Sequence, residues 1–186
     1  MKKTNTNNWN IQTLLEATGG MLTNGELNCR FSNISIDSRQ INKQDLFIAI
    51  IGDMFDGHNF IEDVIKKGVK GIIVQENVVN KIIRNIVKEY NINCITVCDT
   101  VKALGDIALY HRKHMPATVV GITGSNGKTT VKELTSRILE QNAFTLKNPG
   151  NLNNHIGVPL TLLKLQSCHK WSIVEMGMNH IGEIDY

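Results

Sequence analysis

The sequence predicts an α/β fold in two units, each built on a mainly parallel sheet. Short runs of β-branched and other apolar residues alternate with segments of helical periodicity, which is the pattern of strands joined by crossover helices. A glycine-rich segment follows the apolar run at 119–122 and leads directly into a helix-like segment, as in loops that bind phosphate. The chain has 186 residues, 41% of them hydrophobic, which is enough for one large core or two small ones.

The first unit begins with an amphipathic helix, in which Ile11, Leu14 and Leu15 share one face and Gly19-Gly20 ends the pattern. Alternating or continuous apolar runs then predict four strands, with three helices between and after them. Their ranges are 31–36, 45–52, 71–74 and 92–97 for the strands and about 60–68, 78–90 and 101–114 for the helices. Because strands and helices alternate, we expect parallel pairing.

Met115-Pro116 ends the last of these helices, because proline disfavours helical conformation in the residue before it. We therefore expect a first domain at residues 1–115 and a second domain at 116–186.

The second unit opens with Gly121-Ile122-Thr123-Gly124-Ser125-Asn126-Gly127-Lys128-Thr129-Thr130. Glycines let backbone N–H groups turn inward around an anion, and the start of the following helix adds unpaired donors and a positive dipole end. The strict pattern G-x-x-x-x-G-K-[ST] needs glycine where this chain has Ile122, so the loop is a variant. A turn that merely caps a helix has no reason to end in Gly-Lys-Thr. We therefore predict a site for nucleotide phosphates.

Further segments follow this loop and its helix. They are a strand at 144–146, a polar loop at 147–155, a helix at 156–165, a strand at 171–174 that ends on Glu175, and a loop entering another helix at 176–186. Open α/β sheets usually have more strands than this unit offers. We expect 116–186 to be the incomplete opening part of a larger domain.

The charge pattern bears on partners and location. The 20 Lys and Arg residues exceed the 17 Asp and Glu residues by three, and they are scattered rather than gathered into a stripe. The first eight residues pass from lysines into Asn and Thr without an apolar signal core, and no later run is long enough to span a membrane. We expect a cytoplasmic monomer that neither binds nucleic acid nor inserts into a membrane.

Six segments resemble the Mur ligases, the amide-forming enzymes of cytoplasmic peptidoglycan precursor synthesis. The variant loop at 121–130 resembles their ATP loop, and segments 151–163 and 175–184 resemble the members that add D-alanyl-D-alanine. In the first unit, segments 36–39, 45–50 and 55–61 resemble the family's uridine-nucleotide-binding domain. The resemblance covers nearly the whole chain from about Ile11 and implies a three-domain architecture, of which the C-terminal ligase domain is absent here.

The resemblance implies a reaction, cofactors and substrates. ATP, with Mg²⁺, would activate the carboxylate of a UDP-N-acetylmuramoyl-tripeptide as an acyl phosphate, and the amine of D-alanyl-D-alanine would displace the phosphate. One alternative is another Mur-type ligase, such as the one that adds the third peptide residue. A second alternative is a non-catalytic nucleotide-binding fragment.

The same resemblance assigns residues to the ATP site. The β- and γ-phosphates would be held by the loop residues Gly124, Ser125, Asn126, Gly127, Lys128, Thr129 and Thr130. Thr129 and Glu175 are the expected magnesium ligands, because both offer oxygen atoms at ends of neighbouring secondary-structure elements. Lys128, Asn154 and His180 are the expected catalytic residues. Asn154, like Asn151, has a second interpretation as a turn former or helix cap.

The expected substrate contacts lie in both units. Ser38 and Arg39 offer a hydroxyl and a forked cation to uracil or diphosphate. Three residues of a tight turn, Gly57, His58 and Asn59, would line the uracil pocket, although the turn alone can explain Asp56-Gly57. Asn151 and Asn179 complete the expected set.

Overall fold

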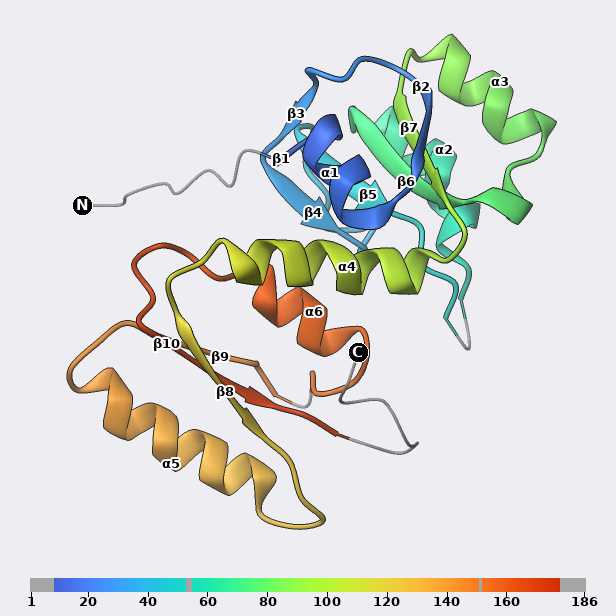
Figure 1. Ribbon diagram of the computed structural model, residues 1–186. Coiled ribbons are helices and arrows are strands. Elements are labelled where there is room, and N and C mark those ends of the chain that lie inside the picture. Colours follow the sequence, from blue (N-terminus) through green and yellow to red (C-terminus); the bar gives the residue numbers. More distant parts are fainter. Residues whose placement is uncertain (1–8, 53–54, 151, 178–186) are drawn as a thin grey trace. The chain divides into compact units, whose positions relative to one another are not determined.

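The computed structural model describes residues 9–52, 55–150 and 152–177 (Figure 1). The chain divides into two compact units, residues 1–103 and 104–186. The division falls inside helix α4 (Thr100–Lys113), whereas the sequence pattern placed a boundary after this helix, at Pro116. Most of α4 goes with the second unit, in which His111 donates a hydrogen bond from Nε2 to the carbonyl of Leu165 (2.9 Å).

The first unit is built on a five-stranded sheet with the order β2-β7-β6-β5-β4 (Figure 1). The four strands from β4 to β7 pair in parallel, as the alternation predicts, whereas the edge strand β2 runs antiparallel to β7. The strands are β2 (Met21–Asn24), β4 (Asn33–Ser35), β5 (Asp45–Ile48), β6 (Gly71–Gln75) and β7 (Asn93–Val97). The sequence pattern does not predict β2, because four residues carry too little periodicity to indicate a strand.

The strand expected at 31–36 is split in the structure. β3 (Arg30–Phe31) pairs with β1 (Trp9–Asn10) in a separate antiparallel ladder, and only β4 joins the main sheet. The side chain of Phe31 is buried against Gly71, where a β-carbon would collide with the phenyl ring. The break in the strand thus allows Phe31 to cover the start of β6.

The helices of the first unit occur where the periodicity predicts them. α1 (Ile11–Thr18) ends at Gly19, whose φ of 63° is left-handed. α3 (Lys81–Glu89) begins later than the predicted residue 78, because its N-cap is Asn80, whose side chain accepts a hydrogen bond from the backbone N–H of Ile83 (3.0 Å). The other helical segments are η1 (Gly57–Phe60), α2 (Ile61–Lys66) and η2 (Glu76–Val78).

A hydrophobic core lies between this sheet and its helices. Phe47 and Ile72 from the sheet, Val64 and Ile65 from α2, and Val87 from α3 belong to one buried cluster. This core fixes the strand ends from which the loops of the first unit project.

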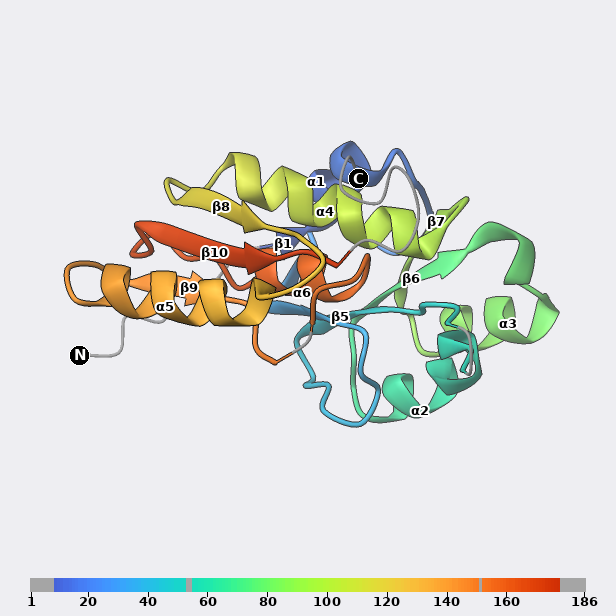
Figure 2. The same cartoon turned by 90° about the horizontal axis from the view of Figure 1, so that it is seen from below.

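The second unit contains a three-stranded parallel sheet with the order β8-β10-β9. Its strands are β8 (Thr118–Ile122), β9 (Thr145–Lys147) and β10 (Trp171–Glu175), and its further helices are α5 (Lys128–Glu140) and α6 (Gly157–Leu162). Figures 1 and 2 show α5 running alongside the three strands. Glu175 is in register with Ile122, so the loops after β8 and β10 leave the same edge of the sheet.

Helix α5 turns an unexpected face toward the sheet. Its apolar residues at helical spacing, Val131, Leu134 and Ile138, are 49%, 57% and 68% exposed. Lys132 and Ser136 are instead fully buried on the inward side. The periodicity therefore predicts the helix correctly but does not identify its buried face.

The helices are short throughout the described part of the chain, where α4 has 14 residues. In the ranges that the structure describes, we find no helix with both the length and the apolar character needed to cross a bilayer.

Candidate nucleotide-binding site

The glycine-rich loop joins the end of β8 to the first residue of α5. Gly124 has a φ of 144° and Gly127 a φ of 77°, in the region that favours glycine, and Gly127 is the residue that precedes the helix. The helix has 13 residues, so its first backbone N–H groups and the positive end of its dipole face this loop. The loop thus has the backbone geometry of an anion site.

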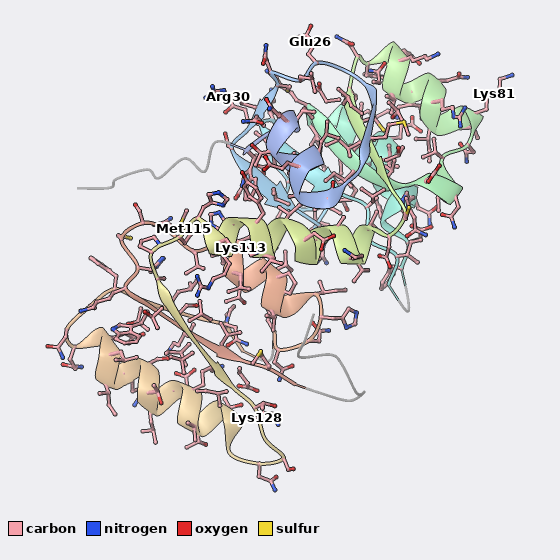
Figure 3. The ribbon with its side chains drawn as sticks, viewed as in Figure 1. Glu26, Arg30, Lys81, Lys113, Met115 and Lys128 are labelled. Carbon is pink, nitrogen blue, oxygen red and sulfur yellow. The ribbon has the colours of Figure 1, made fainter. Side chains whose placement is uncertain are left out.

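Lys128 lies over the loop. Its Nζ donates a hydrogen bond to the carbonyl oxygen of Gly124 at 2.6 Å, and Figure 3 shows the residue at the loop end of α5. The ammonium group is therefore next to the space that the loop encloses.

The structure brings together the two expected magnesium ligands. The hydroxyl of Thr129, in the first turn of α5, donates to Oε2 of Glu175 at 2.9 Å. The other carboxylate oxygen, Oε1, accepts from Nδ2 of Asn153 at 2.9 Å. Burial raises the pKa of the Glu175 carboxyl, but these two hydrogen bonds and the nearby charge of Lys132 outweigh it and hold the pKa below its ordinary value. The carboxylate is therefore ionised at neutral pH.

Lys132 is a site residue that the sequence pattern does not indicate. Its Nζ donates to the carbonyls of Asn148 (3.2 Å) and Gly150 (3.1 Å), and it lies 3.5 Å from Oε2 of Glu175. The only sequence signal is its position four residues after Lys128, which is one helical turn, and that spacing says nothing about which face is buried.

Asn148 is a second residue that the sequence did not single out. Its side chain accepts from the backbone N–H of Glu175 (2.9 Å) and donates to the carbonyls of Glu175 (3.0 Å) and Leu152 (2.9 Å). The side chain is fully buried. It therefore joins the loop after β9 to the end of β10, where Glu175 must be held.

The other predicted residues of the second unit have different outcomes. Asn154 accepts hydrogen bonds from the backbone N–H groups of Gly157 (2.8 Å) and Ile156 (3.3 Å), so in the structure it caps the start of α6. Asn151, Asn179 and His180 lie outside the residues that the structure describes.

In the first unit, Arg39 is paired within its own loop. Its Nε and one terminal nitrogen donate to the two carboxylate oxygens of Asp37, each at 2.9 Å. This pairing lowers the pKa of Asp37 to about 2. The side chain of Arg39 is 84% exposed, and Nζ of Lys67 donates a hydrogen bond to the carbonyl of Ser38 (2.7 Å). A ligand can reach Arg39 but must compete with Asp37.

His58 has both ring nitrogens engaged. Nδ1 donates to Oδ1 of Asp56 (2.6 Å), and Nε2 accepts from the backbone N–H of Gln75 (2.9 Å). Gly57 packs so closely that a β-carbon would lie 2.8 Å from the backbone nitrogen of Ile50. These contacts give both residues structural roles, whereas Asn59 in η1 is exposed.

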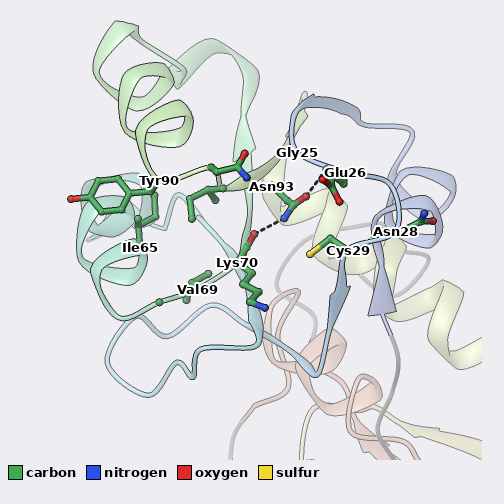
Figure 4. Close-up of a pocket in the computed structure, with 12 residues that line it drawn as sticks. Gly25, Glu26, Asn28, Cys29, Ile65, Val69, Lys70, Tyr90 and Asn93 are labelled. Carbon is green, nitrogen blue, oxygen red and sulfur yellow. Dashed lines mark hydrogen bonds between the residues drawn. The ribbon is translucent and has the colours of Figure 1, made fainter.

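A pocket of about 540 Å³ lies elsewhere in the first unit (Figure 4). Its walls include Cys29, Lys70 and Tyr90, together with Asn93 at the start of β7. Asn93 bridges the wall by accepting from the N–H of Glu26 (2.8 Å) and donating to the carbonyl of Lys70 (2.9 Å). The pocket lies at the N-terminal ends of the parallel strands. His58 lies at the opposite ends, because its Nε2 is bonded to Gln75, the last residue of β6.

Comparison with known families assigns both parts of the chain. Residues 30–112 match the family model described as "Mur ligase family, catalytic domain", and residues 122–186 match "Mur ligase middle domain". With a phosphate-type loop in the second unit, these matches show that the chain belongs to the Mur ligase family.

Within that family, relatives that are 34–41% identical carry the name UDP-N-acetylmuramoyl-tripeptide--D-alanyl-D-alanine ligase, or MurF. The protein of that name from Buchnera aphidicola subsp. Baizongia pistaciae is 41% identical, over 89% of this chain and 36% of its own length. The one from Escherichia coli K12 is 39% identical, over 88% of this chain and 34% of its own length. The chain thus spans about a third of the length of these relatives.

Solved structures agree with this placement. A crystal structure of MurF from Acinetobacter baumannii has a TM-score of 0.85 at 37% identity, covering 97% of this chain and 38% of that one. MurF from Thermotoga maritima, solved in complex with ADP, has a TM-score of 0.69 at 31% identity, covering 82% of this chain and 33% of that one. The α/β fold and the Mur ligase family predicted from the sequence are confirmed.

Proposed function

We propose that this chain carries the ATP-binding loop and the uridine-nucleotide-binding domain of an ATP-dependent ligase. The ligase would join D-alanyl-D-alanine to a UDP-N-acetylmuramoyl-tripeptide in the cytoplasm. The observation that carries the proposal is the Thr129–Glu175 pair at the mouth of a phosphate-type loop. The names of the relatives support the choice of substrates.

The loop offers a place for the phosphates of ATP. Lys128 and the N–H groups from Gly124 to Thr130 would neutralise the β- and γ-phosphates, which is what phosphoryl transfer requires most from a protein. The substrate's own carboxylate would attack the γ-phosphorus and displace ADP. The incoming amine would then attack the acyl carbon of the acyl phosphate and displace phosphate. No side-chain nucleophile is needed for either step.

The donors at the loop fit Mg²⁺. Thr129 and Glu175 supply a hydroxyl and a carboxylate oxygen, and Mg²⁺ typically takes one or two protein oxygens together with phosphate oxygens and water. No group of three His, Cys, Asp or Glu side chains that could hold a metal occurs in the described ranges, so the nucleotide would supply the remaining ligands. The metal would contribute charge neutralisation on the transferred phosphoryl group.

Some of the proposed substrate residues would contact the ligand, and others would hold the loops that carry those contacts. Arg39 would bind a diphosphate by exchanging Asp37 for the ligand, and Ser38 and Asn59 would add polar contacts. Gly57 and His58 would act by shaping the turn that carries Asn59. Asn151 and Asn179 keep the substrate-binding roles, and His180 the catalytic role, that the family resemblance implies. Asn154 would act by fixing the start of α6.

Calorimetric titration of this chain with Mg-ATP tests the ATP site. We expect Lys128→Met to weaken binding by at least about tenfold, because a charge-assisted contact to phosphate is lost. Lys81→Met, at the exposed start of α3, is the matched control and should bind like the wild type. Equal affinity of the Lys128→Met variant and the wild type would refute the assignment. The same titration with UDP-N-acetylmuramoyl-tripeptide, using Arg39→Ala, tests the first unit.

A further inference from the structure

Lys132 is an unusual residue for the inner face of a helix. Its side chain is fully buried and its ammonium group lies among oxygen atoms from two carbonyls and two carboxylates. The distances are 3.2 Å to Asn148 O, 3.1 Å to Gly150 O, 3.5 Å to Glu175 Oε2 and 3.7 Å to Glu133 Oε1. An apolar side chain of similar length would fill the same space without the desolvation cost of a buried charge.

We propose that Lys132 is a positioning residue of the nucleotide site. Its ammonium group acts as a fixed cation that holds the surrounding oxygen atoms in place. The group would hold the loop at 148–150 and the carboxylate of Glu175 against the first turns of α5. This inference rests on the proposed function, because it gives Lys132 a role in presenting Glu175 to Mg-nucleotide.

The contacts show what the ammonium group joins. Lys132 belongs to α5, Asn148 and Gly150 to the loop after β9, and Glu175 to the end of β10, so one charge connects three segments that are distant in sequence. Oε2 of Glu175 lies near both Lys132 and Thr129, which places the cation directly behind the pair proposed to bind metal.

The contacts of Lys132 also indicate that both the charge and the small size of its ammonium group are needed at this position. The two carbonyl oxygens need a donor or a cation, and the nearby carboxylates need positive charge, which a methionine side chain cannot supply. An arginine has the charge, but its planar fork cannot place a single small cation among four oxygens. Lys132 is therefore not equivalent to a residue that only fills space.

The test compares Lys132→Met with the wild-type chain. We expect Lys132→Met to bind Mg-ADP at least about tenfold more weakly, as seen when the supporting partners of metal ligands are removed. Lys132→Ala should bind weakly as well and recover affinity when propylammonium is added, because this ion replaces the deleted segment and its charge. Tetramethylammonium, which has no N–H donor, should give no recovery.

Three results would overturn the proposal. They are wild-type affinity in folded Lys132→Met, equal recovery of Lys132→Ala with both ammonium ions, and unchanged affinity in folded Lys132→Arg. The arginine variant keeps the charge, so it also provides the test if Lys132→Met does not fold.

A measurement without nucleotide separates this inference from the proposed function. Amide hydrogen exchange at Glu175, whose N–H is bonded to Asn148, should be faster in Lys132→Met than in the wild type. If the wild type fails to bind Mg-nucleotide, the proposed function is wrong, and faster exchange still supports the tether. Unchanged exchange at Glu175 would contradict the tether itself.

Discussion

Ser136 buries a hydroxyl group that has no hydrogen-bond partner among the residues that the structure describes. It lies on the inner face of α5, one helical turn after Lys132, and its small size allows the helix to approach the sheet. An unpaired buried hydroxyl costs free energy that an alanine does not, and alanine is also the better helix former.

We therefore expect Ser136→Ala to raise the free energy of unfolding by about 0.5–1.5 kcal/mol, measured by urea denaturation. Thr135→Ala, on the same helix, gains helix propensity without removing a fully buried hydroxyl and serves as the control. A Ser136→Ala variant less stable than the wild type would show that the hydroxyl has a partner in solution.

His111 gives the second unit a pH-dependent contact. Burial lowers the pKa of its imidazole, its hydrogen bond to the carbonyl of Leu165 opposes this, and His114 adds a further lowering. Because the folded pKa lies below the unfolded value of about 6.5, the unfolded chain binds more protons as the pH falls. The stability is therefore complete above about pH 6.5 and is lost progressively below it.

Urea denaturation of the wild type between pH 7.5 and 5.5 should show this loss. His111→Gln keeps a donor for Leu165 but does not titrate, so its stability should change less over the same range. Parallel pH dependence in the two proteins would mean that other groups dominate.

The apolar residues that recur at helical spacing in α5 are exposed to solvent. Val131, Leu134 and Ile138 form a stripe on a helix beside β8, which is an edge strand of the described sheet. Exposed apolar stripes next to open strand edges favour association between chains.

We expect the wild-type chain to self-associate as its concentration rises, and Ile138→Glu to remain closer to the 20.8 kDa monomer, as measured by light scattering after gel filtration. Leu109→Glu replaces a residue on α4 that is 50% exposed and is the matched control. A wild type that stays monomeric at all concentrations would contradict this role of α5.

Across the residues that the structure describes, the sequence predicted the elements better than their faces and boundaries. The parallel strands β5, β6 and β7 follow from continuous apolar runs bounded by helices. The antiparallel β2 and the break after Phe31 depend on contacts with β7 and Gly71, which are distant in sequence and leave no local pattern.

The phosphate-type loop could be predicted because its chemistry is contiguous, from Gly124 to Thr130. The contacts behind it could not, because Lys132, Asn148 and Glu175 are 16 to 43 residues apart and meet only when α5 packs on the sheet. His58 shows the reverse case, since a motif suggested ligand binding while the fold engages both of its ring nitrogens.

The pairing of Arg39 with Asp37 reduces the long-range electrostatic attraction of the first unit for an approaching anion. Two opposite charges held within three residues cancel at distances beyond about 10 Å, the Debye length at ordinary ionic strength. The loop therefore exerts little long-range attraction, and its cation acts only after contact. The rate of encounter with a charged nucleotide sugar should accordingly depend weakly on salt, while the lifetime of the complex reflects the exchange of Asp37 for the ligand.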